Sequence, residues 1–162
     1  MHAFQITGID HEPFEHLFDL TDEQLKAFGA VRRVATENPG FPCRVGLVDA
    51  EIGEELLLLP HAHHAVESPY RASGPIFVRR GARRRTLPAG EVPPYVTRRV
   101  ISLRAYDAAH MMVDAAVCEG TLVAAELQRL LDNDEVAYIQ LHNAKQGCFS
   151  CRVDRKQTLG KP

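Results

Sequence analysis

Apolar and polar residues alternate through residues 101–107 and again through residues 111–117. A period of two is typical of strands that bury one face. When the short loop between them joins the two segments, their apolar faces coincide and Arg104 lies opposite Asp114, a favourable cross-strand pair. The pattern therefore predicts an antiparallel hairpin.

The same alternation returns in residues 137–142 and 148–153. Matching the apolar sides of these segments predicts a second hairpin, and in its register His142 lies directly opposite Cys148. Between the two hairpins, residues 121–131 carry apolar side chains at the spacing of an amphipathic helix. We therefore expect a C-terminal hairpin–helix–hairpin unit.

Earlier segments add further strands and short helices. Residues 56–59 are a continuous leucine run, as in a strand buried on both faces. Thr21 and Gln24 are spaced as a capping box, so a short helix begins there. We predict a single α+β domain over residues 1–162, with about seven or eight strands in a largely antiparallel or mixed sheet and helices packed on it.

Composition agrees with one globular domain. The chain has 162 residues, of which 45% are hydrophobic and 25% are charged. No apolar run approaches the roughly 20 residues that a membrane-spanning helix needs, and the N-terminus lacks the basic and apolar regions of a secretory signal. The four cysteines are irregularly spaced, which indicates free thiols rather than a disulfide framework. We therefore expect a soluble, cytoplasmic protein with no membrane partner.

Charge is strongly segregated, although the net charge is only −2. Residues 1–67 hold 12 acids and 4 bases, whereas residues 68–104 hold 9 arginines and a single acid, Glu91. The densest cluster, residues 79–85, could contact phosphates of a nucleic acid. It could instead be a solvated loop near the acidic first third, and the slightly acidic chain with few aromatic residues favours this interpretation. We expect no nucleic-acid partner.

Cys148 and His142 form the sharpest catalytic candidate. Directly opposed residues of an antiparallel pair have Cβ atoms about 4.5–5.5 Å apart, so a contact between thiol and imidazole is within reach. A neighbouring imidazolium favours the thiolate form of a cysteine, which is the nucleophile. Asn143 could orient His142 if the turn brings it round to that face. The alternative is a hairpin end where a solvated histidine and a half-buried cysteine happen to meet.

The second candidate is a metal site at His61 and His63. Two histidines at i and i+2 of a strand face the same side and can share one divalent metal, with Glu67 as a further ligand. Pro60 argues against this site, because it suggests that the strand ends just before His61. Exposed histidines in a loop are the alternative. Beyond this divalent metal, no cofactor is predicted.

The third candidate is a ligand-binding pair, Tyr70 and Arg71. An arginine guanidinium can hold a carboxylate or a phosphate through two parallel hydrogen bonds. An internal ion pair between Arg71 and the acidic first third is the alternative, so charge alone does not decide between a ligand and a structural partner.

Four segments carry a resemblance to a known family. They read NPGFPCR at 38–44, SPYRASGPIFVR at 68–79, RAYD at 104–107 and HNAKQGC at 142–148. In this order they resemble the bacterial family DUF1203, a domain of unknown function, over about residues 4–155. The resemblance implies a small stand-alone bacterial protein. It assigns no catalytic residue, because no activity is established for the family.

Three functions follow as hypotheses. We favour a non-catalytic binding or interaction module whose polar sheet face or arginine-rich loop engages a small acidic molecule or a protein, because neither catalytic arrangement is complete. The second hypothesis is a thiol-dependent enzyme or redox-sensitive protein that uses Cys148 and His142. The third is a metal-binding protein built on His61 and His63. A homo-oligomer is compatible with all three.

Overall fold

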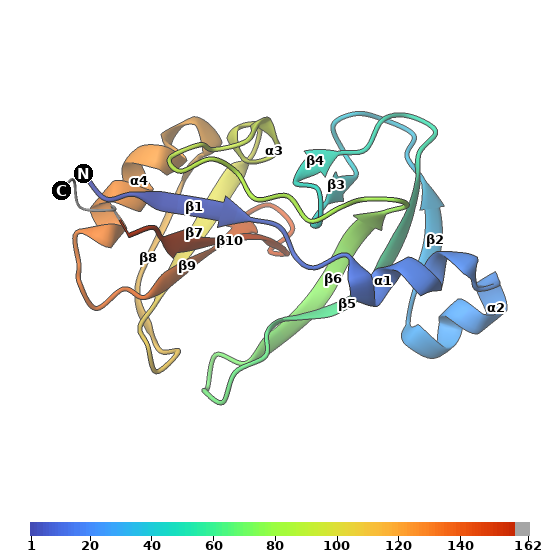
Figure 1. The fold of residues 1–162 in the computed structure, drawn as a ribbon, viewed down its shortest axis with the longest axis horizontal. Coiled ribbons are helices and arrows are strands. Elements are labelled where there is room, and N and C mark those ends of the chain that lie inside the picture. Colours follow the sequence, from blue (N-terminus) through green and yellow to red (C-terminus); the bar gives the residue numbers. More distant parts are fainter. Residues whose placement is uncertain (158–162) are drawn as a thin grey trace. The chain divides into compact units, whose positions relative to one another are not determined.

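The structure, a computed structural model, describes residues 1–157. It shows an α+β protein with two five-stranded sheets and a few short helices (Figure 1). The predicted fold class is confirmed. The predicted number and grouping of strands is wrong, since the described residues form ten strands in two sheets rather than seven or eight strands in one.

The chain divides into two compact units, each with its own sheet. Among the described residues, unit 1 contains Met1–Thr7, Val66–Arg71 and residues 86–157, and unit 2 contains Gly8–Ala65 and Ala72–Arg85. The chain therefore passes from one unit to the other more than once. The single-domain organisation expected from the sequence stays a prediction.

Unit 1 is built on an antiparallel sheet in the order β1-β10-β9-β7-β8 (Figure 1). Its elements are β1 (Phe4–Thr7), α3 (Pro94–Thr97), β7 (Val100–Tyr106), β8 (Met112–Glu119), η3 (Gly120–Leu122), α4 (Val123–Leu131), β9 (Tyr138–Asn143) and β10 (Phe149–Arg155). The succession of β7, β8, α4, β9 and β10 confirms the predicted hairpin–helix–hairpin unit.

One face of this sheet carries the core of unit 1. Leu103 of β7 lies opposite Leu141 of β9, and both side chains are fully buried. Leu127 of α4 is likewise fully buried. An ion pair of 3.2 Å between Arg129 and Asp114 also links α4 to β8. Burying one leucine side chain stabilises a fold by about 1.5–3 kcal/mol. This apolar face therefore holds unit 1 together.

The first hairpin has the predicted strands but a different register. Tyr106 lies opposite Met112, whereas Arg104 lies opposite Ala115. The register shifts by one residue between these pairs, at a β-bulge. The predicted pair of Arg104 with Asp114 is therefore wrong, because one extra residue in a strand moves all pairs beyond it out of phase.

The second hairpin departs from its predicted register in the same way. His142 lies opposite Phe149 rather than Cys148, and Leu141 lies opposite Cys151. A bulge at Ser150 separates these two pairs. The strands are confirmed, and the predicted pairing of His142 with Cys148 is wrong by one residue.

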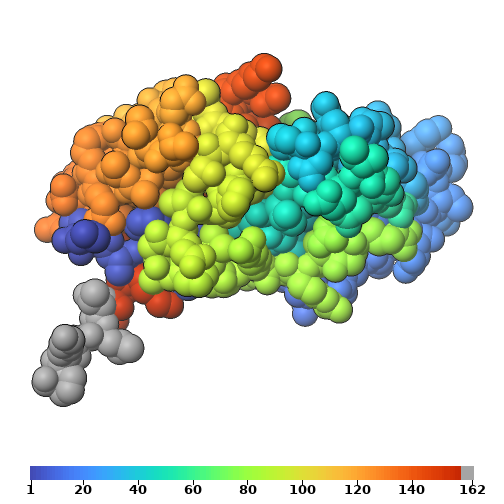
Figure 2. Space-filling view, turned by 90° about the horizontal axis from the view of Figure 1, so that it is seen from above, coloured from blue at the N-terminus to red at the C-terminus, as the bar shows by residue number. Residues whose placement is uncertain are grey.

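The segment that follows Thr86 lies along the outer edge of β1. Leu87 N donates to Ile6 O at 3.0 Å, and Gly90 N donates to Phe4 O at 2.9 Å. Figure 2 shows the same neighbourhood, where the dark-blue atoms of the N-terminus lie beside the yellow-green atoms of this segment. The segment therefore covers an edge that would otherwise be open to pairing with another chain.

Gly120 marks a close approach between two backbone segments of unit 1. It begins η3, and a Cβ atom placed on it would lie 2.2 Å from Val96 O of α3. Even a methyl group would overlap with this carbonyl oxygen. The two short helices therefore pack backbone against backbone, which only glycine permits at this position.

Unit 2 is built on a mixed sheet in the order β2-β5-β6-β3-β4, in which β3 runs parallel to β6. Its elements are α1 (Glu12–Glu15), η1 (His16–Asp19), α2 (Asp22–Leu25), η2 (Lys26–Phe28), β2 (Val31–Val34), β3 (Pro42–Cys43), β4 (Val48–Asp49), β5 (Glu55–His64) and β6 (Ala72–Arg79). The Thr21 side chain accepts from Gln24 N, and the Gln24 side chain accepts from Thr21 N. The predicted capping box is confirmed.

Strand β5 continues past Pro60 to His64, which corrects the predicted strand end. Strand β2 stops opposite Leu58, so among the described strands β5 keeps only β6 as a neighbour at Pro60. Proline is tolerated there because no ladder hydrogen bond is required on the open side. His61 and His63 therefore lie on a strand and not in a loop.

Candidate functional site

The second face of the unit 1 sheet is lined by polar and aromatic side chains. Directly opposed residues of neighbouring strands share a face. The residues that alternate with the leucine core are Ser102, Arg104, Tyr106, Tyr138, Gln140, His142, Arg152 and Asp154. This set, together with the Val66–Arg71 segment whose Tyr70 contacts it, is called the polar face.

Three tyrosines form a continuous aromatic row on the polar face. The rings of Tyr106 and Tyr138 are stacked, with centroids 5.3 Å apart and planes inclined by 21°. Tyr70 meets Tyr106 edge to face at 6.0 Å. Tyr106 and Tyr138 are each 3% exposed, whereas Tyr70 is 36% exposed. The row therefore runs from two buried rings to one accessible ring.

The loop after β7 adds a fourth ring to this row. His110 Nδ1 lies 2.8 Å from the Tyr138 hydroxyl. Ser68 Oγ donates to His110 O at 3.0 Å and accepts from Tyr70 N at 3.0 Å. These bonds tie the Val66–Arg71 segment to the hairpin loop, so that Tyr70 is held against the sheet.

Two arginines stand against the aromatic row. The guanidinium carbon of Arg152 lies 4.1 Å from the centroid of the Tyr138 ring, and Arg152 also pairs with Asp154 at 2.9 Å. Arg104 is hydrogen bonded to Tyr106. Burial raises the pKa of both tyrosines, and the neighbouring arginines oppose this rise only in part. Both phenols are therefore protonated at neutral pH.

The predicted ligand-binding residues Tyr70 and Arg71 both belong to unit 1. Tyr70 is the accessible end of the aromatic row, and Arg71 is exposed beside it. The ion pairs of residues 1–157 include none for Arg71 or Arg104. Tyr106 and Tyr138 are site residues that the sequence did not predict. Their shared strand face was visible in the alternation, but the pairing of β7 with β9 that stacks them was not.

Cys148 lies opposite Asn143 and not opposite His142. Asn143 N donates to Cys148 O at 2.9 Å, and the side-chain Nδ2 of Asn143 lies 3.9 Å from Cys148 Sγ. His142 belongs to the polar face, where its Nδ1 lies 3.2 Å from Gly147 O and its Nε2 lies 3.4 Å from Gln140 Oε1. The predicted direct opposition of thiol and imidazole is wrong. The catalytic role proposed for these three residues stays a prediction.

The predicted metal ligands are distributed over both units. His61 and His63 lie on β5 in unit 2, whereas Glu67 belongs to unit 1. The ring of His61 meets Phe14 edge to face at 6.2 Å, and burial lowers the pKa of His61. Among residues 1–157, no group of three or more His, Cys, Asp and Glu side chains is placed to hold a metal ion. The divalent metal stays a prediction.

Three of the arginines of residues 79–85, Arg79, Arg80 and Arg83, pair with carboxylates of unit 2. Arg79 Nη1 lies 2.8 Å from Glu54 Oε2, and Arg83 Nη1 lies 3.1 Å from Glu15 Oε1. The Arg79 hydrogen bond is the largest cause that lowers the pKa of Glu54. The geometry therefore favours the interpretation of this cluster as a loop that lies against the acidic first third.

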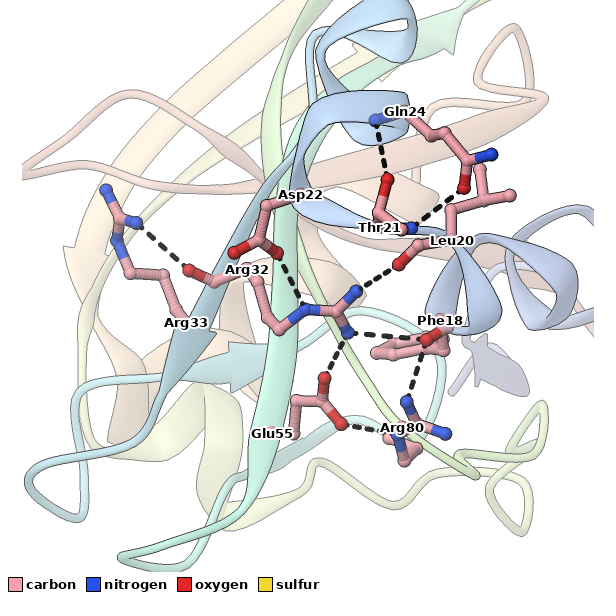
Figure 3. Close-up of polar contacts among 9 residues, drawn as sticks. All are labelled: Phe18, Leu20, Thr21, Asp22, Gln24, Arg32, Arg33, Glu55 and Arg80. Carbon is pink, nitrogen blue, oxygen red and sulfur yellow. Dashed lines mark hydrogen bonds and ion pairs between the residues drawn. The ribbon is translucent and has the colours of Figure 1, made fainter.

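Glu55 is the centre of the network drawn in Figure 3. Its two carboxylate oxygens bind Arg32 and Arg80. Arg32 also lies 3.1 Å from Asp22 and donates to Leu20 O at 2.6 Å. The hydrogen bond from Arg80 is the largest cause that lowers the pKa of Glu55, and the bond from Arg32 adds to it. These guanidinium groups are occupied by partners within the unit.

Fold and site together define a small α+β protein with an aromatic, arginine-bearing sheet face. The chain belongs to the family described as "Protein of unknown function (DUF1203)", whose sequence model matches residues 40–155. The predicted family is confirmed, with a match that begins later than the predicted resemblance. No curated protein and no solved structure matches the chain significantly. Within residues 1–157, no helix is long and apolar enough to cross a membrane.

Proposed function

We propose that unit 1 is a binding module whose polar face holds a small acidic molecule. One observation carries this proposal. Arg71 and Arg104 have no carboxylate partner among residues 1–157, and both belong to the face that presents the accessible ring of Tyr70. A guanidinium without an internal acid can take up a carboxylate or a phosphate through two parallel hydrogen bonds.

On the polar face, an arginine recognises the charge of the ligand and an aromatic ring contacts its apolar part. The acidic group of the ligand binds Arg104, which Tyr106 positions through its hydrogen bond. The apolar or planar part of the ligand lies against Tyr70, the accessible end of the aromatic row. The buried rings do not need to move for this, because stacking already fixes them. A preorganised face of this kind loses little conformational entropy on binding.

The setting that we propose for this function is the bacterial cytoplasm. None of the four cysteines, all of which lie within residues 1–157, forms a disulfide. Free thiols are the usual state in a reducing compartment. The anionic metabolites of that compartment are accordingly the first ligands to test.

Thermal unfolding in the presence of small anions tests the proposal. The panel contains succinate, citrate, inorganic phosphate and a nucleoside monophosphate, each titrated at constant ionic strength because salt screens exposed charges. A ligand at a hundredfold excess over its Kd stabilises the folded state by about 2.7 kcal/mol, so its midpoint shift is readily measured. We expect at least one anion to bind saturably.

Three variants assign the binding to the polar face. We expect Arg104→Gln and Tyr70→Ala each to weaken the affinity by about tenfold, the effect of losing one charged or aromatic contact. Arg83→Gln is the matched control, since it removes an exposed arginine that pairs with Glu15 in unit 2. The proposal fails if no anion of the panel shifts the midpoint, or if Arg83→Gln weakens binding as much as Arg104→Gln.

A further inference from the structure

Three aliphatic side chains lie on the polar face beside Arg104. Directly opposed residues of β7 and β8 share a face, and Ala115 lies opposite Arg104. Val117 lies opposite Ser102 in the same way. Val100 belongs to this face as well, because it precedes Ser102 on β7 by two residues. Val100, Ala115 and Val117 are called the aliphatic strip.

The aliphatic strip is open to solvent. Val117 is 67% exposed, Val100 is 41% exposed, and Ala115 is exposed too. In the part of the chain that the structure describes, β8 is the last strand of its sheet, so no further strand lies beyond the strip. Single exposed valines need no explanation, whereas adjoining apolar side chains next to a charged group mark a candidate contact surface.

The two ends of the aliphatic strip differ in charge. Arg104 at one end has no carboxylate partner among residues 1–157. Glu119 lies opposite Val100 at the other end, and it is exposed. An acid group is therefore attracted to the Arg104 end and repelled from the Glu119 end. This arrangement favours a molecule with one acid group and an uncharged tail.

The aliphatic strip and the aromatic row lie on opposite sides of Arg104 along β7. Tyr106, which contacts Tyr70, follows Arg104 by two residues, whereas Val100 precedes it by four. Each residue of a strand advances by about 3.3 Å, so the stretch from Arg104 to Val100 spans about 13 Å. The strip therefore adds a second apolar surface to the one proposed for Tyr70, and an extended hydrocarbon chain can lie along it.

We propose that the polar face binds linear monocarboxylic acids, with the carboxylate on Arg104 and the alkyl chain along the aliphatic strip. This inference rests on the anion binding proposed above and names the class of acid. The guanidinium can hold the carboxylate through two parallel hydrogen bonds. Methylene groups that leave water against the two valines add to the affinity. A second carboxylate at the far end of the chain would approach Glu119, so a dicarboxylate of the same length binds more weakly.

Calorimetric titration of the intact chain with butyrate, hexanoate, octanoate and decanoate tests the proposal. All concentrations stay below micelle formation, and the ionic strength is constant. We expect each added methylene to raise the affinity about twofold, because an open strip removes only part of its surface from water. Sebacate, the dicarboxylate of the same length as decanoate, should bind about fivefold more weakly than decanoate. Equal affinities for butyrate and decanoate, or for decanoate and sebacate, would overturn the proposal.

Val117→Thr assigns the alkyl chain to the aliphatic strip. Threonine keeps the β-branched shape that suits a strand and replaces one methyl group by a hydroxyl. We expect the affinity for decanoate to fall about threefold and that for butyrate to stay the same. Val34→Thr is the matched control, since Val34 is a 54% exposed valine on the edge strand β2 of unit 2. Equal losses of decanoate affinity in the two variants would contradict the assignment.

Arg104→Gln and Tyr70→Ala separate this inference from the proposed function. We expect Arg104→Gln to weaken all four acids by the same factor of about ten. Tyr70→Ala should leave the dependence on chain length unchanged. If that dependence is lost in Tyr70→Ala and retained in Val117→Thr, the chain lies on the aromatic row, so the strip is wrong and the proposed function stands. If Arg104→Gln binds decanoate as well as the unaltered chain does, both proposals fail.

Discussion

The arginines of the two units are used in different ways. In unit 2, Arg32 and Arg80 share the carboxylate of Glu55, and their remaining donors reach backbone carbonyls. In unit 1, Arg71 and Arg104 have no such acid among residues 1–157. The denser cluster of positive charge is therefore the structural one. The sequence of residues 79–85 has the pattern of a phosphate site, yet Arg79, Arg80 and Arg83 already pair with carboxylates inside the unit.

The difference gives a criterion for choosing candidate ligand-binding arginines, namely that no internal carboxylate pairs with them. Charge density along the chain is a property of the sequence, whereas the presence of an internal acid depends on which strands pair. A neutralised guanidinium holds the fold, and an unneutralised one beside an accessible ring can hold a ligand. The following substitutions measure this contrast, beginning with the largest expected change.

Glu55→Gln should cause the largest loss of stability. The substitution leaves Arg32 and Arg80 without the carboxylate that joins them, and charged hydrogen bonds of this kind contribute about 1.5–3 kcal/mol. Urea unfolding gives the free energy, and hydrogen exchange of the β5 amides assigns the loss to unit 2. Glu23→Gln is the control, because the exposed pair of Glu23 with Lys26 contributes little. Equal losses in the two variants would contradict the structural role of Glu55.

Acid should weaken unit 2 for the same reason. The folded state lowers the pKa of Glu54 and Glu55 below their ordinary value near 4.5, with Arg79 and Arg80 as the main causes. The unfolded chain therefore binds protons first as the pH falls, so their contribution is present above about pH 4.5 and is lost through the folded-state pKa. Unfolding measured from pH 6 to pH 3 should show this loss. The Glu54→Gln, Glu55→Gln double variant should have a flatter profile, and an unchanged profile would refute the assignment.

The stability of unit 2 should also depend on the ionisation of His61, with a smaller effect and in a higher pH range. Burial lowers its pKa from the ordinary value of 6.5, so the folded state keeps the ring neutral while the unfolded chain takes up a proton. Stability therefore decreases as the pH falls below about 6.5. His61→Phe keeps an aromatic ring next to Phe14 and should remove this slope. A slope that survives the substitution would have to come from another histidine.

Arg104→Gln should cost about 1 kcal/mol of stability, less than Glu55→Gln, because one hydrogen bond to Tyr106 is lost but no internal acid loses its partner. The same variant is expected to lose anion affinity. Glu55→Gln should behave in the opposite manner, with a large stability loss and unchanged anion affinity. Measuring both quantities for both variants completes the comparison, and a large stability loss in Arg104→Gln would make that arginine structural as well.

Local signals in the sequence were sufficient for the elements. The capping box at Thr21 and the helix at residues 121–131 depend on neighbours within a few positions, and both are confirmed. The two C-terminal hairpins were found because alternation fixes a strand face. Their registers were wrong because each hairpin contains a bulge, one of them at Ser150, which alternation alone does not locate.

The candidate site was only partly predictable for a related reason. Tyr70 was singled out from its own surroundings, whereas the stacking of Tyr106 on Tyr138 requires the long-range pairing of β7 with β9. The change of strand register at Ser150 likewise means that the side chain next to Cys148 is the amide of Asn143 and not the predicted imidazole of His142. Where a site depends on strand order or on one bulge, the sequence names the residues but not their partners.

The close approach at Gly120 has a consequence for genetic experiments on this protein. A side chain of any kind would meet Val96 O, so a saturation library should be depleted of every substitution at this codon. Glycine has no side chain with which to bind a ligand, and the depletion would reflect the cellular abundance of folded protein. In a survival screen alone, substitutions at Gly120 would be indistinguishable from substitutions that remove a function of the polar face. Measuring protein abundance together with survival would distinguish residues that are needed for folding from residues that are needed for function.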